Sequence, residues 1–203
     1  MLQGDGYGSR VCPVVERQSP QLPVQRIRPE QMVSIGRNSN LSLQRELAKG
    51  GKFLAIEAPM PAKATVGGIL ASNASGPLRF GHGLPRDWLI GIGVVNARGV
   101  ETKAGGKVVK NVTGYDLAKL YVGSLGMLRV IEDPWLRLLP LPECVSGFCV
   151  DGPAAAAAFA QGLAASRRAS ARAVVVEMPL SGETKLVIEL AGQEATVRHD
   201  GDW

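Results

Sequence analysis

The chain has 203 residues, of which 45% are hydrophobic and 20% are charged, with a formal net charge of +5. This balance is typical of one folded domain, or of one domain with part of a second, and no apolar run reaches the roughly 18 residues of a membrane helix, so direct membrane insertion is not expected. The 23 basic residues are scattered and aromatic residues make up 5%, so nucleic acid is not an expected partner.

The first elements follow an irregular arm. Residues 1–28 are rich in Pro, Gln and Arg and lack periodicity, which indicates a loop. Gln31–Ile35 is a short strand candidate. Ser39 or Asn40 then caps a predicted helix over Leu41–Lys49, and two glycines end it.

The middle of the chain combines small residues with strands. Thr65 is predicted to cap a short helix that contains Gly67 and Gly68. Trp88–Val95 is rich in β-forming residues, and a turn joins it to a returning strand, Val100–Lys103. The sequence therefore predicts a hairpin after the glycine-bearing helix.

The next elements lead to a boundary. Tyr115–Val122 is a predicted helix that Asp116 caps. Leu128–Leu139 is a strand candidate in which Pro134 indicates an edge or a bulge, because proline donates no ladder hydrogen bond. Pro140–Pro142 is the best candidate for a domain boundary.

A second group of elements follows the boundary. Cys144–Val150 is a predicted strand, Asp151 is predicted to cap an alanine-rich helix over Pro153–Arg168, and Ala173–Met178 and Lys185–Leu190 are two further strands. This order predicts the start of an α+β sheet domain that the chain does not complete.

Three glycine-rich segments make the chain recognisable: TVGGILASNASGP from Thr65, GGKVVKNVTGYDL from Gly105, and GSLGMLRVI from Gly123. With RDWLIG from Arg86, they resemble the PCMH-type FAD-binding domain of the vanillyl-alcohol-oxidase flavoproteins, and within that superfamily the E subunits of bacterial glycolate oxidases. The resemblance implies an α+β fold whose second FAD subdomain is largely present and whose first is incomplete.

The resemblance also implies a domain order and a set of cofactor contacts. Residues 1–28 would be an arm or a remnant of the first subdomain, 29–142 the FAD-binding domain, and 143–203 a partial α+β cap domain. Amide groups and a hydroxyl at a helix start suit a pyrophosphate, although close packing without a ligand would use the same residues. FAD contacts are implied at Thr65, Gly67, Gly68, Asn73, Gly76, Asp87, Gly123 and Ile131.

Other positions leave alternatives open. Arg129 stands where the family has glycine, and could block the adenine or point away and pair with the FAD phosphates. Lys110 could face the flavin or support its loop. His82 is expected to be a loop residue rather than part of a site. The three cysteines form no C-x-x-C pair, so no metal site is expected, and no catalytic residue is assigned.

The implied function is that of an FAD-binding subunit. It would belong to a complex that oxidises a small 2-hydroxy acid, glycolate to glyoxylate, together with a catalytic flavoprotein subunit and an iron–sulfur subunit that receives the electrons. Without a secretory signal at Met1–Asp5, the cytoplasm is the expected location, at the inner membrane if partners dock it there. The alternative is a shortened, flavin-free scaffold.

Overall fold

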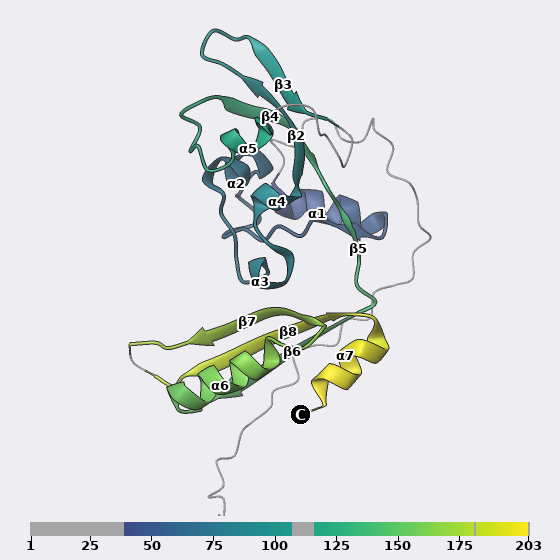
Figure 1. Cartoon of the computed structure of the whole chain (residues 1–203), viewed down its shortest axis with the longest axis vertical. Coiled ribbons are helices and arrows are strands. Elements are labelled where there is room, and N and C mark those ends of the chain that lie inside the picture. The colour runs from purple at the N-terminus through teal and green to yellow at the C-terminus, as the bar shows by residue number, and fades with distance from the viewer. Residues whose placement is uncertain (1–38, 107–115, 181, 203) are drawn as a thin grey trace, which may run out of the picture. The chain divides into compact units, whose positions relative to one another are not determined.

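Figure 1 shows the computed structural model of the chain, which describes residues 39–106, 116–180 and 182–202. These residues fall into two compact units that divide between Leu141 and Pro142. The division lies inside the segment at which the sequence predicts a boundary. The identity of each unit as a domain stays a prediction, and each unit is described by itself.

The first unit alternates short helices with two small sheets. Its elements are α1 (Asn40–Lys49), β1 (Lys52–Phe53), α2 (Val66–Ser72), α3 (Arg79–His82), α4 (Pro85–Trp88), β2 (Leu89–Val95), β3 (Glu101–Gly105), α5 (Ala118–Tyr121), β4 (Val130–Leu136) and β5 (Leu139–Pro140). An antiparallel sheet has the order β3-β2-β4, and β1 pairs with β5. The mixed α and β content matches the predicted α+β class.

Strand β2 is the centre of the larger sheet because its sequence, LIGIGVV, is apolar enough to be covered on both faces. Ile92 and Val94 are buried together with Leu70 of α2. β4 pairs along one side of β2, and Pro134 lies on it opposite Ile92. The predicted edge position of Pro134 is confirmed, since β2 is the one described strand that pairs with β4.

Helix α1 begins and ends as its sequence predicts. Ser39 is the cap, and its Oγ accepts a hydrogen bond of 3.2 Å from the Ser42 N–H. Gly50 follows the last turn, and Gly51 has φ of +66°, a conformation that glycine adopts without steric cost. Gln44 then fixes the next segment, because its amide both donates to the Leu54 carbonyl (2.6 Å) and accepts from the Leu54 N–H (3.1 Å).

Two predictions for the first unit are wrong in detail. Trp88 ends helix α4 instead of starting the strand. α5 is a single turn that begins after Leu117 without a side-chain cap, so Asp116 does not cap it. The position of this turn is explained by Lys119, because its ammonium donates to the carbonyls of Arg86 and Leu89 at the end of α4. Local sequence patterns do not predict such a contact between two elements. Lys110 lies outside the described residues.

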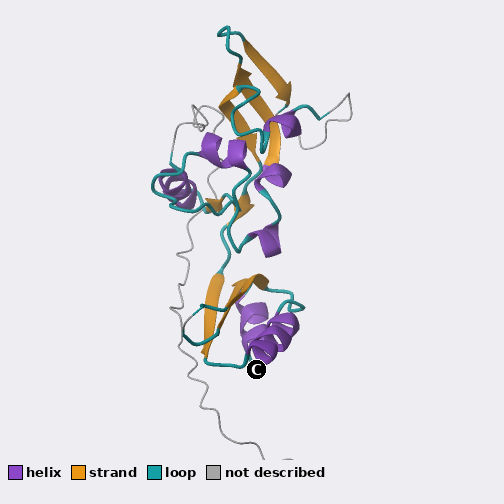
Figure 2. Cartoon of the chain, turned by 90° about the vertical axis from the view of Figure 1, so that its left-hand side faces the viewer, coloured by secondary structure: helices purple, strands orange, loops and turns teal. Residues whose placement is uncertain are grey.

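The second unit is a three-stranded antiparallel sheet with two helices. Its elements are β6 (Cys144–Asp151), α6 (Ala155–Ala165), β7 (Ala171–Glu177), β8 (Lys185–Gly192) and α7 (Glu194–Gly201), with the strand order β6-β8-β7. Both helices lie on the same face of the sheet (Figure 2), over Leu186, Ile188 and Leu190 of β8. The predicted β–α–β–β order is confirmed, and α7 extends it.

The predicted cap of α6 is wrong. Asp151 is the last residue of β6, and its carboxylate lies 3.5 Å from the Lys185 ammonium on the neighbouring strand. α6 begins after Ala154 and has no side-chain cap. Gly152, at φ of +79°, turns the chain between the strand and the helix, so the carboxylate that precedes the helix belongs to the sheet. No helix in the described part of the chain is long and apolar enough to cross a membrane.

Candidate functional site

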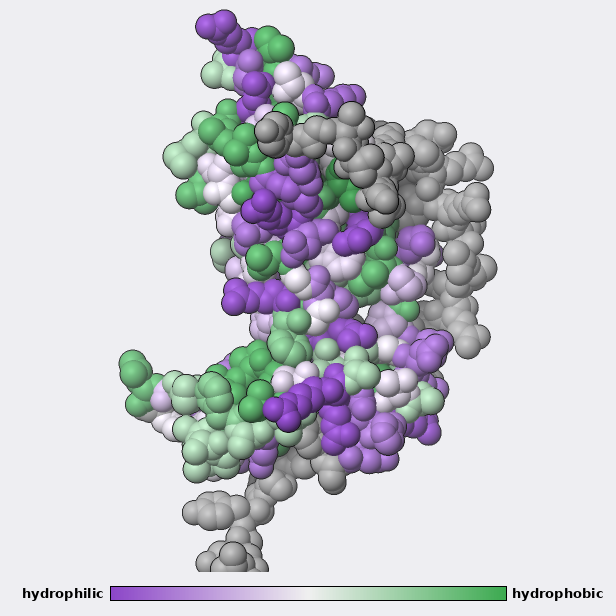
Figure 3. All heavy atoms as spheres, in the orientation of Figure 1, coloured by the Kyte–Doolittle hydropathy of each residue, from purple (hydrophilic) through white to green (hydrophobic). Residues whose placement is uncertain are grey.

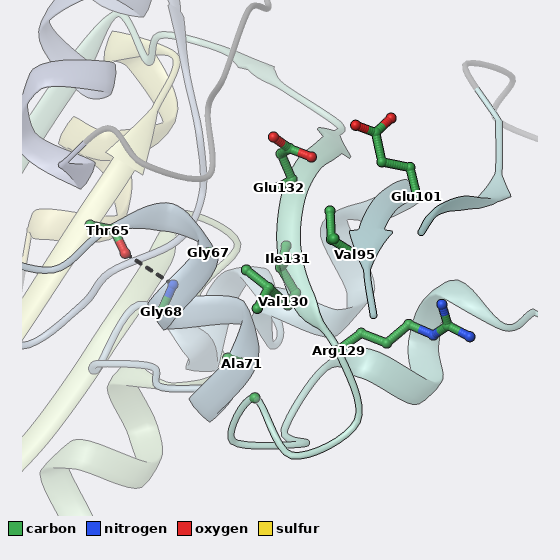
Figure 4. Close-up of a pocket in the computed structure, with 11 residues that line it drawn as sticks. Thr65, Gly67, Gly68, Ala71, Val95, Glu101, Arg129, Val130, Ile131 and Glu132 are labelled. Atoms are coloured by element: carbon green, nitrogen blue, oxygen red, sulfur yellow. Dashed lines mark hydrogen bonds between the residues drawn. The ribbon is translucent and has the colours of Figure 1, made fainter. Parts of the chain in front are cut away.

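A cavity of about 690 Å³ opens in the first unit, between the start of α2, the β2–β3 hairpin and β4 (Figure 4). It is lined by Thr65, Gly67, Gly68, Ala71, Val95, Glu101, Gly126, Arg129, Val130, Ile131 and Glu132. Cavities of about 300–1,000 Å³ are typical of small-molecule sites. Its two walls differ in chemistry.

The wall formed by α2 consists of small residues, and its polar groups are the Thr65 hydroxyl and the backbone. The Thr65 Oγ1 accepts a hydrogen bond of 3.1 Å from the Gly68 N–H (Figure 4), which fixes the first helical turn. A Cβ at Gly68 would lie only 3.1 Å from that oxygen, so the capped turn favours glycine there. With Gly67 and Ala71 beside it, this wall offers backbone rather than side chains to the cavity.

The opposite wall is aliphatic with charged residues. Val95, Val130 and Ile131 supply the apolar surface, and Glu101 and Glu132 add two carboxylates. The guanidinium of Arg129 donates to the Thr102 hydroxyl (3.2 Å). Its side chain extends away from Thr65 and Gly68 (Figure 4), so it leaves the space beside α2 open.

These residues fit part of a dinucleotide. Glycine backbone at a capped helix start lets a phosphate approach closely, carboxylates accept hydrogen bonds from ribose hydroxyls, and aliphatic side chains cover a flat ring. Outside the lining, Asn73 Oδ1 and Ser124 Oγ are buried without a hydrogen-bond partner among the described residues. Because buried polar atoms are normally hydrogen-bonded, they add unsatisfied acceptor and donor capacity near the end of α2.

The structure brings together four of the eight predicted cofactor contacts. Thr65, Gly67, Gly68 and Ile131 line the cavity, although they come from two elements far apart in the sequence. The remaining four positions lie outside its lining. Contact with FAD at all eight stays a prediction.

Asn73 and Gly123 lie side by side at the far end of α2. Asn73 is the residue after the helix and is left-handed, with φ of +52°. The Gly123 N–H donates to the Leu70 carbonyl (2.9 Å), and a Cβ on Gly123 would lie 3.7 Å from the Asn73 Cβ. Their visible role is to hold the chain around the helix end.

Gly76 and Asp87 also have structural contacts. A Cβ on Gly76 would come within 2.3 Å of the Glu57 carboxylate, which accepts a hydrogen bond of 3.0 Å from the Leu78 N–H. Asp87 accepts from the Leu84 N–H (2.8 Å) and so caps α4. Both residues shape the segment between α2 and β2.

Six lining residues were not predicted from the sequence. They are Ala71, Val95, Glu101, Gly126, Val130 and Glu132. Val95 and Glu101 flank the hairpin turn and are register partners in the sheet, so the predicted turn could have identified them as neighbours. Nothing in the local sequence indicates that α2 packs beside β4.

The residues considered for other chemistry lie elsewhere. The His82 ring packs edge-on against Phe53 (5.7 Å between centroids) and Trp88 (6.3 Å), and the Trp88 indole N–H donates to the His82 carbonyl (2.9 Å). The Cys144 side chain is buried and the Cys149 side chain is half-buried. Among the described residues, no group of His, Cys, Asp and Glu side chains could hold a metal ion.

Comparison with known proteins identifies the segment around α2. Residues 38–105, about a third of the chain, match the family model described as an FAD binding domain. These residues are similar to an FAD binding domain. The match includes α2 and both strands of the hairpin, so it covers the wall of the cavity that the glycines form, and FAD is the cofactor indicated for it.

Relatives of known function support the same assignment. The chain is 37% identical over 104 residues to the glycolate oxidase subunit GlcE of Escherichia coli (strain K12), which covers 51% of this chain and 30% of that protein. It is 43% identical over 77 residues to a D-lactate dehydrogenase of Archaeoglobus fulgidus, covering 38% and 17%. The chain therefore spans less than a third of the length of these two relatives.

A solved structure extends the likeness of fold beyond the matched segment. The alkyldihydroxyacetonephosphate synthase has a TM-score of 0.68 and 17% sequence identity, and the match covers 88% of this chain and 40% of that one. At this identity the likeness shows the fold alone. The chain accordingly shares the fold of this synthase, with mixed helix and strand content.

Proposed function

We propose that this chain is the FAD-binding part of an oxidoreductase that acts on a small 2-hydroxy acid. One observation carries the proposal: the capped, glycine-bearing start of α2 lines a cavity of about 690 Å³ inside the segment that matches an FAD binding domain. The two relatives are a glycolate oxidase subunit and a D-lactate dehydrogenase, and glycolate and D-lactate are both 2-hydroxy acids. Glycolate is the substrate proposed first.

The bound flavin would supply the acceptor for the electrons of the substrate, which protein side chains do not offer. The protein's part is positioning. Thr65 holds the first turn of α2 in place through the Gly68 N–H, and the lack of side chains at Gly67 and Gly68 lets a phosphate group approach the backbone. Val95, Val130 and Ile131 would cover the opposite side of the bound group.

The proposal also covers the partners of the chain and its location in the cell. The GlcE relative is named as a subunit, which supports assembly of this chain into a complex. A catalytic flavoprotein subunit, an iron–sulfur electron acceptor and docking at the cytoplasmic face of the inner membrane complete the proposal, and these three rest on the family resemblance alone.

A visible absorption spectrum tests the cofactor assignment. The purified chain is incubated with FAD, desalted and scanned, and retained flavin bands near ~370 and ~450 nm are expected if the chain binds FAD by itself. Addition of glycolate or D-lactate under anaerobic conditions should then bleach the ~450 nm band if the substrate site is also present.

A colourless protein after desalting would contradict FAD binding by this chain and favour the alternative of a flavin-free scaffold. Retained flavin that neither acid bleaches would uphold the cofactor and reject the proposed substrate class for this chain. A titration that follows the fluorescence of free FAD distinguishes weak binding from none, because a weak complex loses its flavin on the column.

A further inference from the structure

Helix α6 of the second unit has an outer face that is unlike a helix surface in water. Ala158, Gly162 and Ala165 face the sheet and are buried. The opposite face is exposed and carries no charge from Ala155 to Ala165; Phe159 and Leu163 are 65% and 59% exposed. Figure 3 shows apolar residues gathered over this helix. A surface helix normally presents charged residues to solvent, and exposed apolar patches mark contact sites.

The charges at the two ends of α6 have opposite signs. Arg167 is exposed and follows the C-terminal end of the helix. At the N-terminal end, the exposed Glu183 carboxylate lies beside Gly152, 3.3 Å from the place of a Cβ there. An antiparallel second copy of the helix would bring each Arg167 to the Glu183 of the other copy. The helix dipoles would also be opposed, which is favourable.

The apolar face is complementary to itself in the same arrangement. With a two-fold axis at Ala160, Leu163 of one copy faces Ala157 of the second copy. Phe159 lies beside the axis and faces Gln161 of the second copy. Leu163 therefore meets a small side chain, as close packing of two helices requires. A two-fold contact uses one patch on both copies, so every favourable pair occurs twice.

We propose that α6 is a homodimerisation surface, on which a second copy of this chain packs its α6 antiparallel, with Arg167 of each copy paired to Glu183 of the other. The partner at this surface is a second copy of the chain, because the apolar residues and the end charges of α6 are complementary to those of a second, antiparallel α6. This inference does not depend on flavin binding.

Sedimentation velocity over a concentration series tests the dimer. The unaltered chain is expected to dimerise reversibly. Ala160→Glu should abolish dimerisation, because two carboxylates would meet at the axis. Ala195→Glu, an exposed alanine of α7, is the matched control and should dimerise like the unaltered chain. Circular dichroism confirms that each variant is folded.

Charge reversal tests the antiparallel arrangement. Arg167→Glu and Glu183→Arg should each raise the dissociation constant of the dimer by about tenfold, because the symmetry counts each repulsive pair twice. The double variant, or an equimolar mixture of the single variants, should return it to the original value. A chain that stays monomeric at every concentration, an Ala160→Glu variant that still dimerises, or a double variant that is no better than the singles would overturn the proposal.

Discussion

At the scale of single residues, the second unit depends on one buried carboxylate. Asp200 of α7 is 5% exposed and accepts two hydrogen bonds from Ser170, one from the hydroxyl (2.6 Å) and one from the backbone N–H (2.9 Å). These bonds, the hydroxyl's first, hold the pKa of Asp200 below its usual value. They attach the last helix to the start of β7, 30 positions earlier in the chain.

The lowered pKa makes this attachment dependent on pH. A carboxyl whose pKa is lower in the folded than in the unfolded chain stabilises the fold fully above its unfolded pKa of about 4, and this stabilisation is lost as the pH falls through the folded value. Ser170→Ala should therefore cost about 2 kcal/mol at neutral pH and progressively less in acid. Urea unfolding from pH ~7 to pH ~2 measures the difference.

Ser166→Ala is the matched control, because the Ser166 hydroxyl donates to the Leu163 carbonyl (2.8 Å) and meets no carboxylate. Its effect should be smaller and should keep the same size at every pH. If the cost of Ser170→Ala is independent of pH, the hydrogen bonds do not perturb Asp200.

At the scale of elements, two neighbouring helix caps allow an effect on the stability of the fold to be distinguished from an effect on cofactor binding. Ser39 caps α1 and Thr65 caps α2 by the same hydroxyl-to-amide bond, and the two residues face each other in an isolated antiparallel bridge. Thr65 alone of the pair lines the cavity. Loss of either cap has the same local chemistry but a different position relative to the proposed cofactor.

Thr65→Ala and Ser39→Ala should each lower the free energy of unfolding by about 1 kcal/mol. Thr65→Ala should in addition weaken FAD binding by about tenfold, since a frayed first turn no longer holds Gly67 and Gly68 against the ligand. Denaturation curves give the first quantity and FAD fluorescence titration gives the second. Equal affinities for FAD in the two variants would argue against α2 as the cofactor wall, and Thr65→Ser should restore both quantities.

Elements with a local chemical cause could be predicted from the sequence, and those with a distant cause could not. The Ser39 and Thr65 caps, the turn after Val95 and the edge position of Pro134 follow from the residue types themselves. The single turn of α5 depends on Lys119, which bonds to carbonyls about 30 positions away. Helix α7 has little apolar periodicity, and its buried Asp200 is held by hydrogen bonds from Ser170, far away in the sequence.

The candidate site divides in the same way. The glycines of α2 were recognisable because their motif is local, whereas Glu101 and Glu132 reach the cavity through the pairing of β2 with β3 and β4. Gly76 and Asp87 lie in motifs that resemble the family, yet the contacts they make here are with Glu57 and Leu84. A motif thus predicts that a segment is present, but it does not show which of its residues contact a ligand and which pack against the rest of the protein.

At the scale of the whole molecule, the described residues form two hydrophobic cores that share no residue. One gathers around Leu54, Leu70 and Ile92, and the other around Leu186 and Leu190. Independent cores are expected to unfold in separate transitions. A substitution in one core should therefore move one transition and leave the other unchanged.

Gly91→Ala tests this separation. A Cβ at Gly91 would lie 2.3 Å from the Trp135 ring and 2.9 Å from the Gly106 backbone nitrogen, so the strand or the ring must shift, at a cost of about 1–3 kcal/mol. Differential scanning calorimetry should show the transition of the first unit at a lower temperature. Ser170→Ala should lower the other transition, and a single transition that both variants shift would mean that the units unfold together.

The turn between β2 and β3 restricts where the chain can accept added sequence. Exposed hairpin tips usually tolerate insertions, and this one is exposed at Arg98 and Gly99. However, the Asn96 side chain accepts hydrogen bonds from the Arg98 and Val100 N–H groups, both 2.9 Å, and the residues next to the turn, Val95 and Glu101, are register partners that both line the cavity. A longer loop would loosen the binding wall itself, so an affinity tag or a fused domain belongs elsewhere on this chain.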